Sequence, residues 1–219
     1  MKLGTYVEIE TAVDQVAEAL DFYEKLGFQA TGTGAVTDGW IVIRPVAGHQ
    51  PTPTIRYLGS NTALIKRMGI AHEQHGDSLE LTDPSGMHIL LTPGPATAKP
   101  AARSRSCCGR FGELAIPCKN LNRAVAYWQK LGYERLHLSS DPYPWSVLSD
   151  GLLIVGLHQT TMLGAPTITY VAGDIQERIQ HFRDVGLALN SMQPEVNGPV
   201  INLSFTAPGG QKYAVRRAR

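Results

Sequence analysis

Alternation of hydrophobic and polar side chains marks two short segments far apart in the chain. Residues 6–10 and 113–116 each place apolar side chains on one face of an extended chain and mostly polar or aromatic ones on the other. Apolar residues then recur at helical spacing over 16–26 and 121–131, and a glycine follows the last apolar position of each stripe or stands next to it. The pattern therefore predicts a strand followed by a helix at both places.

The remaining patterns repeat this order, with further strands and one more helix in each half. The His-Glu-Gln-His segment at 72–75 lies between glycines and lacks the i, i+4 histidine spacing of zinc-binding helices, so a solvated loop is predicted there. The further predicted helices are 62–68 and 175–185. One or two brief strands, punctuated by Gly32, Gly34 and Gly39, are predicted before the strand at 40–44, and the other predicted strands are 54–58, 79–81, 88–91, 133–138, 145–148, 152–157, 168–171, 200–205 and 213–216.

Similar segments recur in the second half in the same order as in the first, with a steadily growing offset. The chain is therefore predicted to consist of two copies of one design, of which the first is shorter. Each copy contains two modules, and each module has a strand, a helix and several antiparallel strands. The similar pairs are 20–28 with 125–133, 38–43 with 150–155, 54–58 with 167–171, and 82–86 with 206–210.

A proline-rich segment of small residues separates the two copies and is predicted to be a linker. The predicted domains are accordingly residues 1–95 and 110–219, joined by the linker 96–109.

Composition excludes several classes of protein. The 219 residues carry 20 Lys and Arg against 19 Asp and Glu, which gives a net charge of +1 and no signal for nucleic-acid binding. No apolar run is long enough to cross a membrane, and three cysteines, two of them adjacent, do not form a disulfide framework. We expect a cytoplasmic protein without nucleic-acid or membrane partners, either a monomer with pseudo-symmetric halves or a homodimer.

The four βαβββ modules resemble those of the vicinal oxygen chelate superfamily, which includes glyoxalase I, extradiol dioxygenases and bleomycin-resistance proteins. The resemblance rests on the helix ends Phe-Tyr-Glu-Lys-Leu-Gly-Phe at 22–28 and Tyr-Trp-Gln-Lys-Leu-Gly-Tyr at 127–133, and on the turns at 83–87 and 207–211. It implies an α+β fold in which tandem modules form two cupped mixed sheets with helices outside.

The resemblance also implies a divalent metal held by His and Glu side chains, but the matching positions supply few ligands. In the second half they are Glu113, Thr167 and Ala214, and in the first half they are Tyr6 or Glu8, then Thr54 and Leu90. One candidate ligand in each half does not hold a catalytic ion. We therefore expect no metal and no cofactor, with a bound divalent metal as the disfavoured alternative.

Side chains that face a cup are the candidates for binding a small molecule. The second half offers Glu113, Tyr143, Trp145 and His158, and the first half offers Tyr6, Glu8, Trp40 and Arg56. Trp128 falls on a helical stripe and is predicted to be a core residue. The longer second half is the predicted location of the working site.

These observations favour a small-molecule-binding protein of the glyoxalase and bleomycin-resistance type. The alternative is a metal-dependent lyase, isomerase or dioxygenase of the same superfamily, and a structural role with filled cups is a third possibility. Neither the ligand nor any catalytic residue follows from the sequence.

Overall fold

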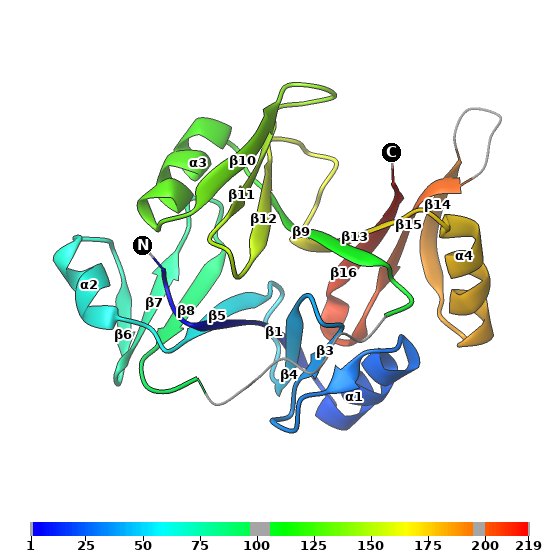
Figure 1. Cartoon of the computed structure of the whole chain (residues 1–219), viewed down its shortest axis with the longest axis horizontal. Coiled ribbons are helices and arrows are strands. Elements are labelled where there is room, and N and C mark those ends of the chain that lie inside the picture. The colour runs from blue at the N-terminus through cyan, green and yellow to red at the C-terminus, as the bar shows by residue number, and fades with distance from the viewer. Residues whose placement is uncertain (1, 97–105, 195–199, 219) are drawn as a thin grey trace. The chain divides into compact units, whose positions relative to one another are not determined.

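The computed structural model describes residues 2–96, 106–194 and 200–218, so most of the predicted linker lies outside the described residues (Figure 1). Strands and helices alternate in the predicted order. The helices are α1 (Val16–Lys25), α2 (Thr62–Arg67), α3 (Leu121–Lys130) and α4 (Ile175–Asp184). The strands are β1 (Tyr6–Val13), β2 (Gln29–Ala30), β3 (Val36–Thr37), β4 (Val42–Ala47), β5 (Thr54–Leu58), β6 (Glu73–His75), β7 (Ser78–Thr82), β8 (His88–Thr92), β9 (Arg110–Pro117), β10 (Glu134–Ser139), β11 (Trp145–Ser149), β12 (Ile154–His158), β13 (Thr167–Ala172), β14 (Leu189–Pro194), β15 (Val200–Thr206) and β16 (Lys212–Arg217).

The strands form two eight-stranded mixed sheets, one from each half of the chain. Their orders are β2-β3-β4-β1-β5-β8-β7-β6 and β10-β11-β12-β9-β13-β16-β15-β14. The second order is the first with every strand replaced by its counterpart in the repeat. The predicted fold class, α+β with tandem βαβββ modules, is therefore confirmed.

Local sequence signals explain where the helices begin and end. The Asn120 side chain accepts a hydrogen bond of 2.9 Å from the Arg123 amide at the start of α3, as an N-cap residue does. Gly27 and Gly132 follow the ends of α1 and α3 with φ values of 84° and 96°. Only glycine adopts this left-handed conformation without strain, so both helices stop there.

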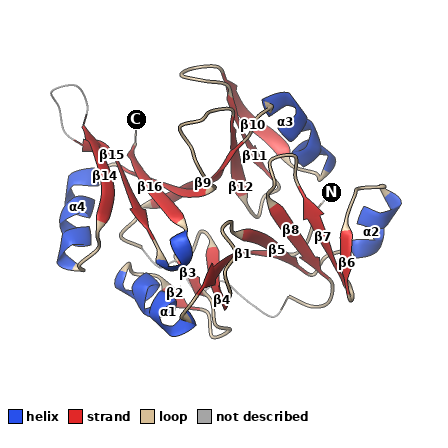
Figure 2. Ribbon diagram, turned by 180° about the vertical axis from the view of Figure 1, so that it is seen from behind, coloured by secondary structure: helices blue, strands red, loops and turns tan. Residues whose placement is uncertain are grey.

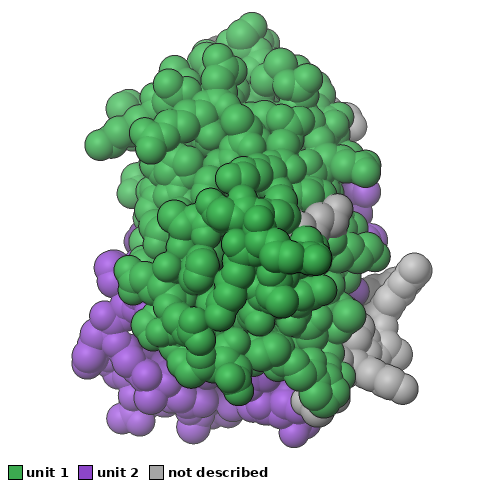
Figure 3. All heavy atoms as spheres, turned by 90° about the vertical axis from the view of Figure 1, so that its left-hand side faces the viewer, with its two compact units in different colours: residues 1–10, 52–99, 114–166 green, residues 11–51, 100–113, 167–219 purple. Residues whose placement is uncertain are grey.

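Contacts divide the chain into two compact units, which are coloured separately in Figure 3. Unit 1 comprises residues 1–10, 52–99 and 114–166, and unit 2 comprises residues 11–51, 100–113 and 167–219. Each unit thus contains segments from both halves of the chain, and β1 and β9 run from one unit into the other. The domain boundaries expected from the sequence stay a prediction.

The core of unit 1 is built around polar contacts between aromatic side chains and carboxylates. Trp128 is fully buried, as predicted, and its indole nitrogen donates to Asp83 at 3.0 Å. The Tyr57 hydroxyl donates to Asp150 at 2.6 Å and lies 2.5 Å from the hydroxyl of Tyr133.

Unit 2 contains a corresponding set of contacts. The Tyr170 hydroxyl donates to Asp38 at 2.6 Å, and the Tyr213 hydroxyl donates to that of Tyr23 at 3.0 Å. Helix α4 packs against β15 and β16 in this unit, as Figure 2 shows. Its buried residues Ile175, Ile179 and Phe182 form the apolar stripe that the helical spacing predicts.

Two strands were not predicted. Residues 73–75, expected to be a loop, form β6 at the edge of the first sheet, and 189–194 form β14 at the edge of the second. Nearly all side chains of both strands are exposed, so neither has the apolar face that marks a strand in sequence. No helix among the described residues is both long and apolar enough to cross a membrane.

Candidate functional site

Three of the predicted ligand-binding side chains lie together on the second sheet, within unit 1. Trp145 begins β11 and His158 ends β12, and the two residues are directly opposite each other in this antiparallel pair. Their rings are parallel to within 2°, with centroids 5.8 Å apart. The Tyr143 hydroxyl lies 3.3 Å from Nδ1 of His158. We call Tyr143, Trp145 and His158 the aromatic cluster.

Strand alternation determines which face of the sheet carries this cluster. Helix α3 packs against β11 and β12, and Leu148 and Leu157 of these strands are fully buried. Successive side chains of a strand point to opposite faces, so Trp145 and His158 lie on the face that carries neither leucine. This is the face on which the sequence predicted a ligand.

Neighbouring groups hold the cluster in place. The Trp145 indole nitrogen donates to the backbone carbonyl of Asp141 at 3.0 Å, and the Trp145 ring lies 4.7 Å from that of His137. His158 is 2% exposed, whereas Tyr143 and Trp145 are half-buried. The cluster therefore combines a buried imidazole with an indole and a phenol that solvent partly reaches.

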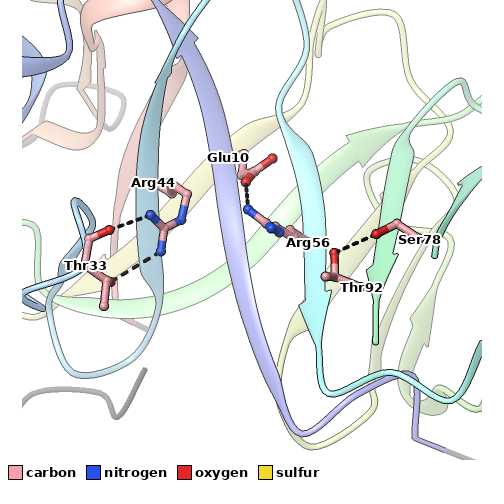
Figure 4. A network of polar contacts seen from close by, with 6 residues as sticks. All are labelled: Glu10, Thr33, Arg44, Arg56, Ser78 and Thr92. Carbon is pink, nitrogen blue, oxygen red and sulfur yellow. Dashed lines mark hydrogen bonds and ion pairs between the residues drawn. The ribbon is translucent and has the colours of Figure 1, made fainter. Parts of the chain in front are cut away.

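Charged side chains occupy one face of the first sheet, also within unit 1. Glu8 of β1 lies opposite Arg56 of β5 in the strand register, so these two predicted site residues are cross-strand neighbours. Nη1 of Arg56 donates to Glu10 at 2.7 Å, as Figure 4 shows. The carboxylate of Glu10 thereby balances the guanidinium charge of Arg56.

A second group of titratable side chains lies on the neighbouring strands β6, β7 and β8. Glu80 accepts from Nδ1 of His88 at 2.5 Å and is 3.1 Å from Nε2 of His75. The register places His88 beside Thr54, which lies two residues before Arg56 on β5 and on the same face of the sheet. A carboxylate that binds one nitrogen of an imidazole orients the ring and sets its tautomer, so this group has the components for proton transfer.

The other predicted site residues lie apart from the aromatic cluster or in unit 2. Tyr6 is buried on β1 and pairs in register with Leu58. In unit 2, Trp40 is 55% exposed and Glu113 is 8% exposed on β9. Binding of a ligand by these residues stays a prediction.

Several polar residues of these faces were missed in the sequence. They are Glu10, His75, Glu80, His88 and His137. The alternation of 79–81 and 88–91 already places Glu80 and His88 opposite the buried leucine and isoleucine side chains. Pairing the two strands in an antiparallel hairpin would have brought these two residues together.

Similarity to known proteins is found among solved structures. No protein-family model matches the sequence, and a search of curated proteins finds no match. A catechol 2,3-dioxygenase is 14% identical with a TM-score of 0.58, over 100% of this chain and 89% of that chain. Homoprotocatechuate 2,3-dioxygenase from Arthrobacter globiformis is 13% identical with a TM-score of 0.64, over 99% and 80%. The 2,3-dioxygenase LapB from Pseudomonas sp. KL28 is 13% identical with a TM-score of 0.61, over 100% and 93%.

These likenesses show that the chain has the fold of these 2,3-dioxygenases. They also contradict the expectation that the chain uses no cofactor. The structures that share its fold are dioxygenases by name, so the expectation of no cofactor is withdrawn.

The described residues do not form the ligand set that a divalent metal needs. In unit 2, the register places Thr169, and not the predicted Thr167, beside Ala214, and Glu113 is the one carboxylate among these residues. In unit 1, Arg56 lies between Glu8 and Leu90 in the corresponding row. Across the described parts of the chain, no group of three His, Cys, Asp or Glu side chains is placed to hold a metal ion. We therefore assign no metal ligands.

Proposed function

We propose that the chain binds a small planar molecule at the aromatic cluster in unit 1. The observation that carries this proposal is the parallel arrangement of Trp145 and His158, with the Tyr143 hydroxyl at the imidazole nitrogen. Small-molecule sites combine flat apolar surfaces with a few fixed polar groups. The half-buried indole offers such a surface, and the phenol and imidazole offer hydrogen-bonding edges.

A dihydroxylated aromatic ring fits this arrangement. Its face would stack on the indole, and its hydroxyl groups would reach the polar edges of Tyr143 and His158. The names of the similar solved structures support this class, since they include a catechol 2,3-dioxygenase and homoprotocatechuate 2,3-dioxygenases.

Catalysis is the second candidate function. The similarity to dioxygenases favours an enzyme over a protein that only binds its ligand. The class would then be a lyase, isomerase or dioxygenase. We assign no catalytic step to individual residues.

Titration of the purified chain with catechol tests the proposed site. Trp145→Ala removes the stacking surface and is expected to weaken catechol binding about tenfold, since an aromatic contact contributes about 0.5–1.5 kcal/mol. Trp145→Phe keeps a ring and should retain most of the affinity. Trp40→Ala is the matched control, because it removes an exposed tryptophan in unit 2.

Isothermal calorimetry gives the dissociation constants of these variants. If Trp40→Ala weakens binding and Trp145→Ala does not, the site lies in the shorter first half and the proposal is wrong. Oxygen uptake and bound metal, measured in the same samples, distinguish an enzyme from a binding protein.

A further inference from the structure

A cavity of about 400 Å³ opens within unit 2, away from the aromatic cluster. Its walls are the end of α1 and the residues after it, the first turns of α4, and Cys107. The volume falls in the range of small-molecule sites. The lining residues are Glu24, Lys25, Leu26, Gly27, Cys107, Asp174, Glu177, Arg178 and His181.

The backbone of Cys107 is fixed on both sides in this cavity. Its amide donates to the Leu26 carbonyl at 2.8 Å, and its carbonyl accepts from Nη1 of Arg178 at 3.1 Å. Arg178 is held in turn by two hydrogen bonds to the Asp174 carboxylate, at 2.9 and 3.0 Å. These hydrogen bonds therefore fix the backbone of Cys107 in the wall of the cavity.

The neighbours of Cys107 favour its thiolate form. A hydrogen bond from the Cys108 thiol lowers the pKa of Cys107, and the positive charge of Arg178 lowers it further, against the opposing effect of burial. Cys108 itself is fully buried, and burial raises its pKa. Thiolates, not thiols, are the nucleophiles in disulfide exchange.

We propose that Cys107 is a reactive thiol and that the cavity admits a small zwitterionic disulfide, with which Cys107 forms a mixed disulfide. The cavity presents the carboxylates of Glu24 and Glu177 and the ammonium group of Lys25 beside the Asp174–Arg178 ion pair. Charges of both signs match a molecule that itself carries ammonium and carboxylate groups.

The reaction is a thiol–disulfide exchange. The Cys107 sulfur attacks one sulfur of the disulfide, a new S–S bond forms, and the original S–S bond breaks. The second half of the disulfide leaves as a thiolate with the electron pair and takes a proton from water. The small disulfide is the oxidant, and one of its two halves is released as a thiol.

The other cysteines provide internal controls. Burial, with the nearby negative charge of Asp83, raises the pKa of Cys118 to about 11, so little of it is thiolate at neutral pH. Cys108 is 0% exposed. Exchange should therefore occur at one of the three cysteines, and Cys107→Ser should abolish it while Cys118→Ser leaves it unchanged.

The 219-residue chain is incubated at pH 7 with L-cystine, which carries ammonium and carboxylate groups and no net charge, or with bis(2-hydroxyethyl) disulfide, which carries no charged groups. Mass spectrometry follows the modified peptide, and rates are normalised to those of the same chain unfolded in urea. We expect Cys107 to react at least tenfold faster than Cys118, and the zwitterionic disulfide to show about a fivefold larger enhancement on folding. Cys108→Ala, which removes the hydrogen-bond donor, should slow the reaction several-fold.

Two results would overturn the proposal. One is a Cys107 that reacts no faster in the folded than in the unfolded chain. The other is an equal enhancement for both disulfides, which would exclude recognition of the zwitterion. These measurements on the wild-type chain remain decisive if the Cys108→Ala variant does not fold. Neither outcome depends on catechol binding in unit 1.

Discussion

Units 1 and 2 use the same pair of residues to join the two halves of the chain. In unit 1, Tyr57 from the first half donates to Asp150 from the second. In unit 2, Tyr170 from the second half donates to Asp38 from the first, at the same distance of 2.6 Å. Tyr57 matches Tyr170 and Asp38 matches Asp150 in the sequence repeat. The repeat therefore conserves a bond between the copies, with donor and acceptor exchanged.

A second polar contact differs between the units. In unit 1 the Trp128 indole donates to Asp83. The matching residues in unit 2 are Tyr23 and Ala207, so the carboxylate is missing there, and Tyr213 provides the partner for Tyr23. Tyr213 occupies the position that Ile89 occupies in unit 1. Ile55 pairs with Ile89, and Ile168, its counterpart in the repeat, pairs with Tyr213. Each unit thus gives its buried aromatic side chain a different hydrogen-bond partner.

Alkaline pH should have the largest effect, and it should destabilise both units. Burial raises the pKa of Tyr23 to about 12, and raises those of Tyr57, Tyr133, Tyr170 and Tyr213 well above their ordinary value. The folded chain keeps protons that the unfolded chain loses above about pH 10, so stability falls as pH rises from there. Each phenol lowers the free energy of unfolding by about 1.4 kcal/mol per pH unit until the pH reaches its pKa in the folded chain.

Burial also raises the pKa of Tyr127 in unit 1 to about 12, so each unit contains three such phenols and the two units should lose stability over the same pH range. Absorbance of the phenolate reports all six, and fluorescence of the buried Trp128 reports unit 1. We expect the absorbance change and the fluorescence change to coincide. Phenols that titrate singly near pH 10, without loss of structure, would contradict the expectation.

Transfer of the unit 2 contact into unit 1 tests the second difference. Asp83→Ala leaves the indole of Trp128 and the turn amides of Ser85 and Met87 without their acceptor, and should cost about 3 kcal/mol of unfolding free energy. In the double variant Asp83→Ala/Trp128→Tyr, adding Ile89→Tyr should recover about 1 kcal/mol, because two phenols can then pair as in unit 2.

Ile89→Phe in the same double variant is the matched control, since it adds the ring without the hydroxyl. Urea unfolding gives the free energies. Equal stability of the Tyr and Phe versions would mean that the phenol pair of unit 2 depends on surroundings that unit 1 lacks.

The sequence was sufficient to predict most of the fold, because the buried strands have an apolar face. Thr54–Leu58 was predicted with the bounds of β5, since Ile55 and Tyr57 alternate with more polar residues. The exposed β14 has no such face, and it was missed for that reason.

The candidate site was predictable only in part. Trp145 and His158 lie at the ends of two predicted strands, but their stacking depends on a register that the sequence does not state. The pairing of Tyr57 with Asp150 joins residues from different halves, so it depends on tertiary structure. No local pattern marks it.

The smallest expected difference concerns the conserved Tyr–Asp bond itself. The Tyr57 hydroxyl contacts both Asp150 and Tyr133, whereas the Tyr170 hydroxyl donates to Asp38. Tyr57→Phe therefore removes two contacts and should cost about 2 kcal/mol, and Tyr170→Phe should cost about 1 kcal/mol. Urea unfolding of both variants at pH 7 measures this difference. Tyr133→Phe is the control: it removes one of the two contacts in unit 1, and should reduce the cost of a subsequent Tyr57→Phe substitution to about that of Tyr170→Phe. If Tyr170→Phe costs as much as Tyr57→Phe in the wild-type background, the Tyr57–Tyr133 contact adds no stability and the two units are equivalent at this bond.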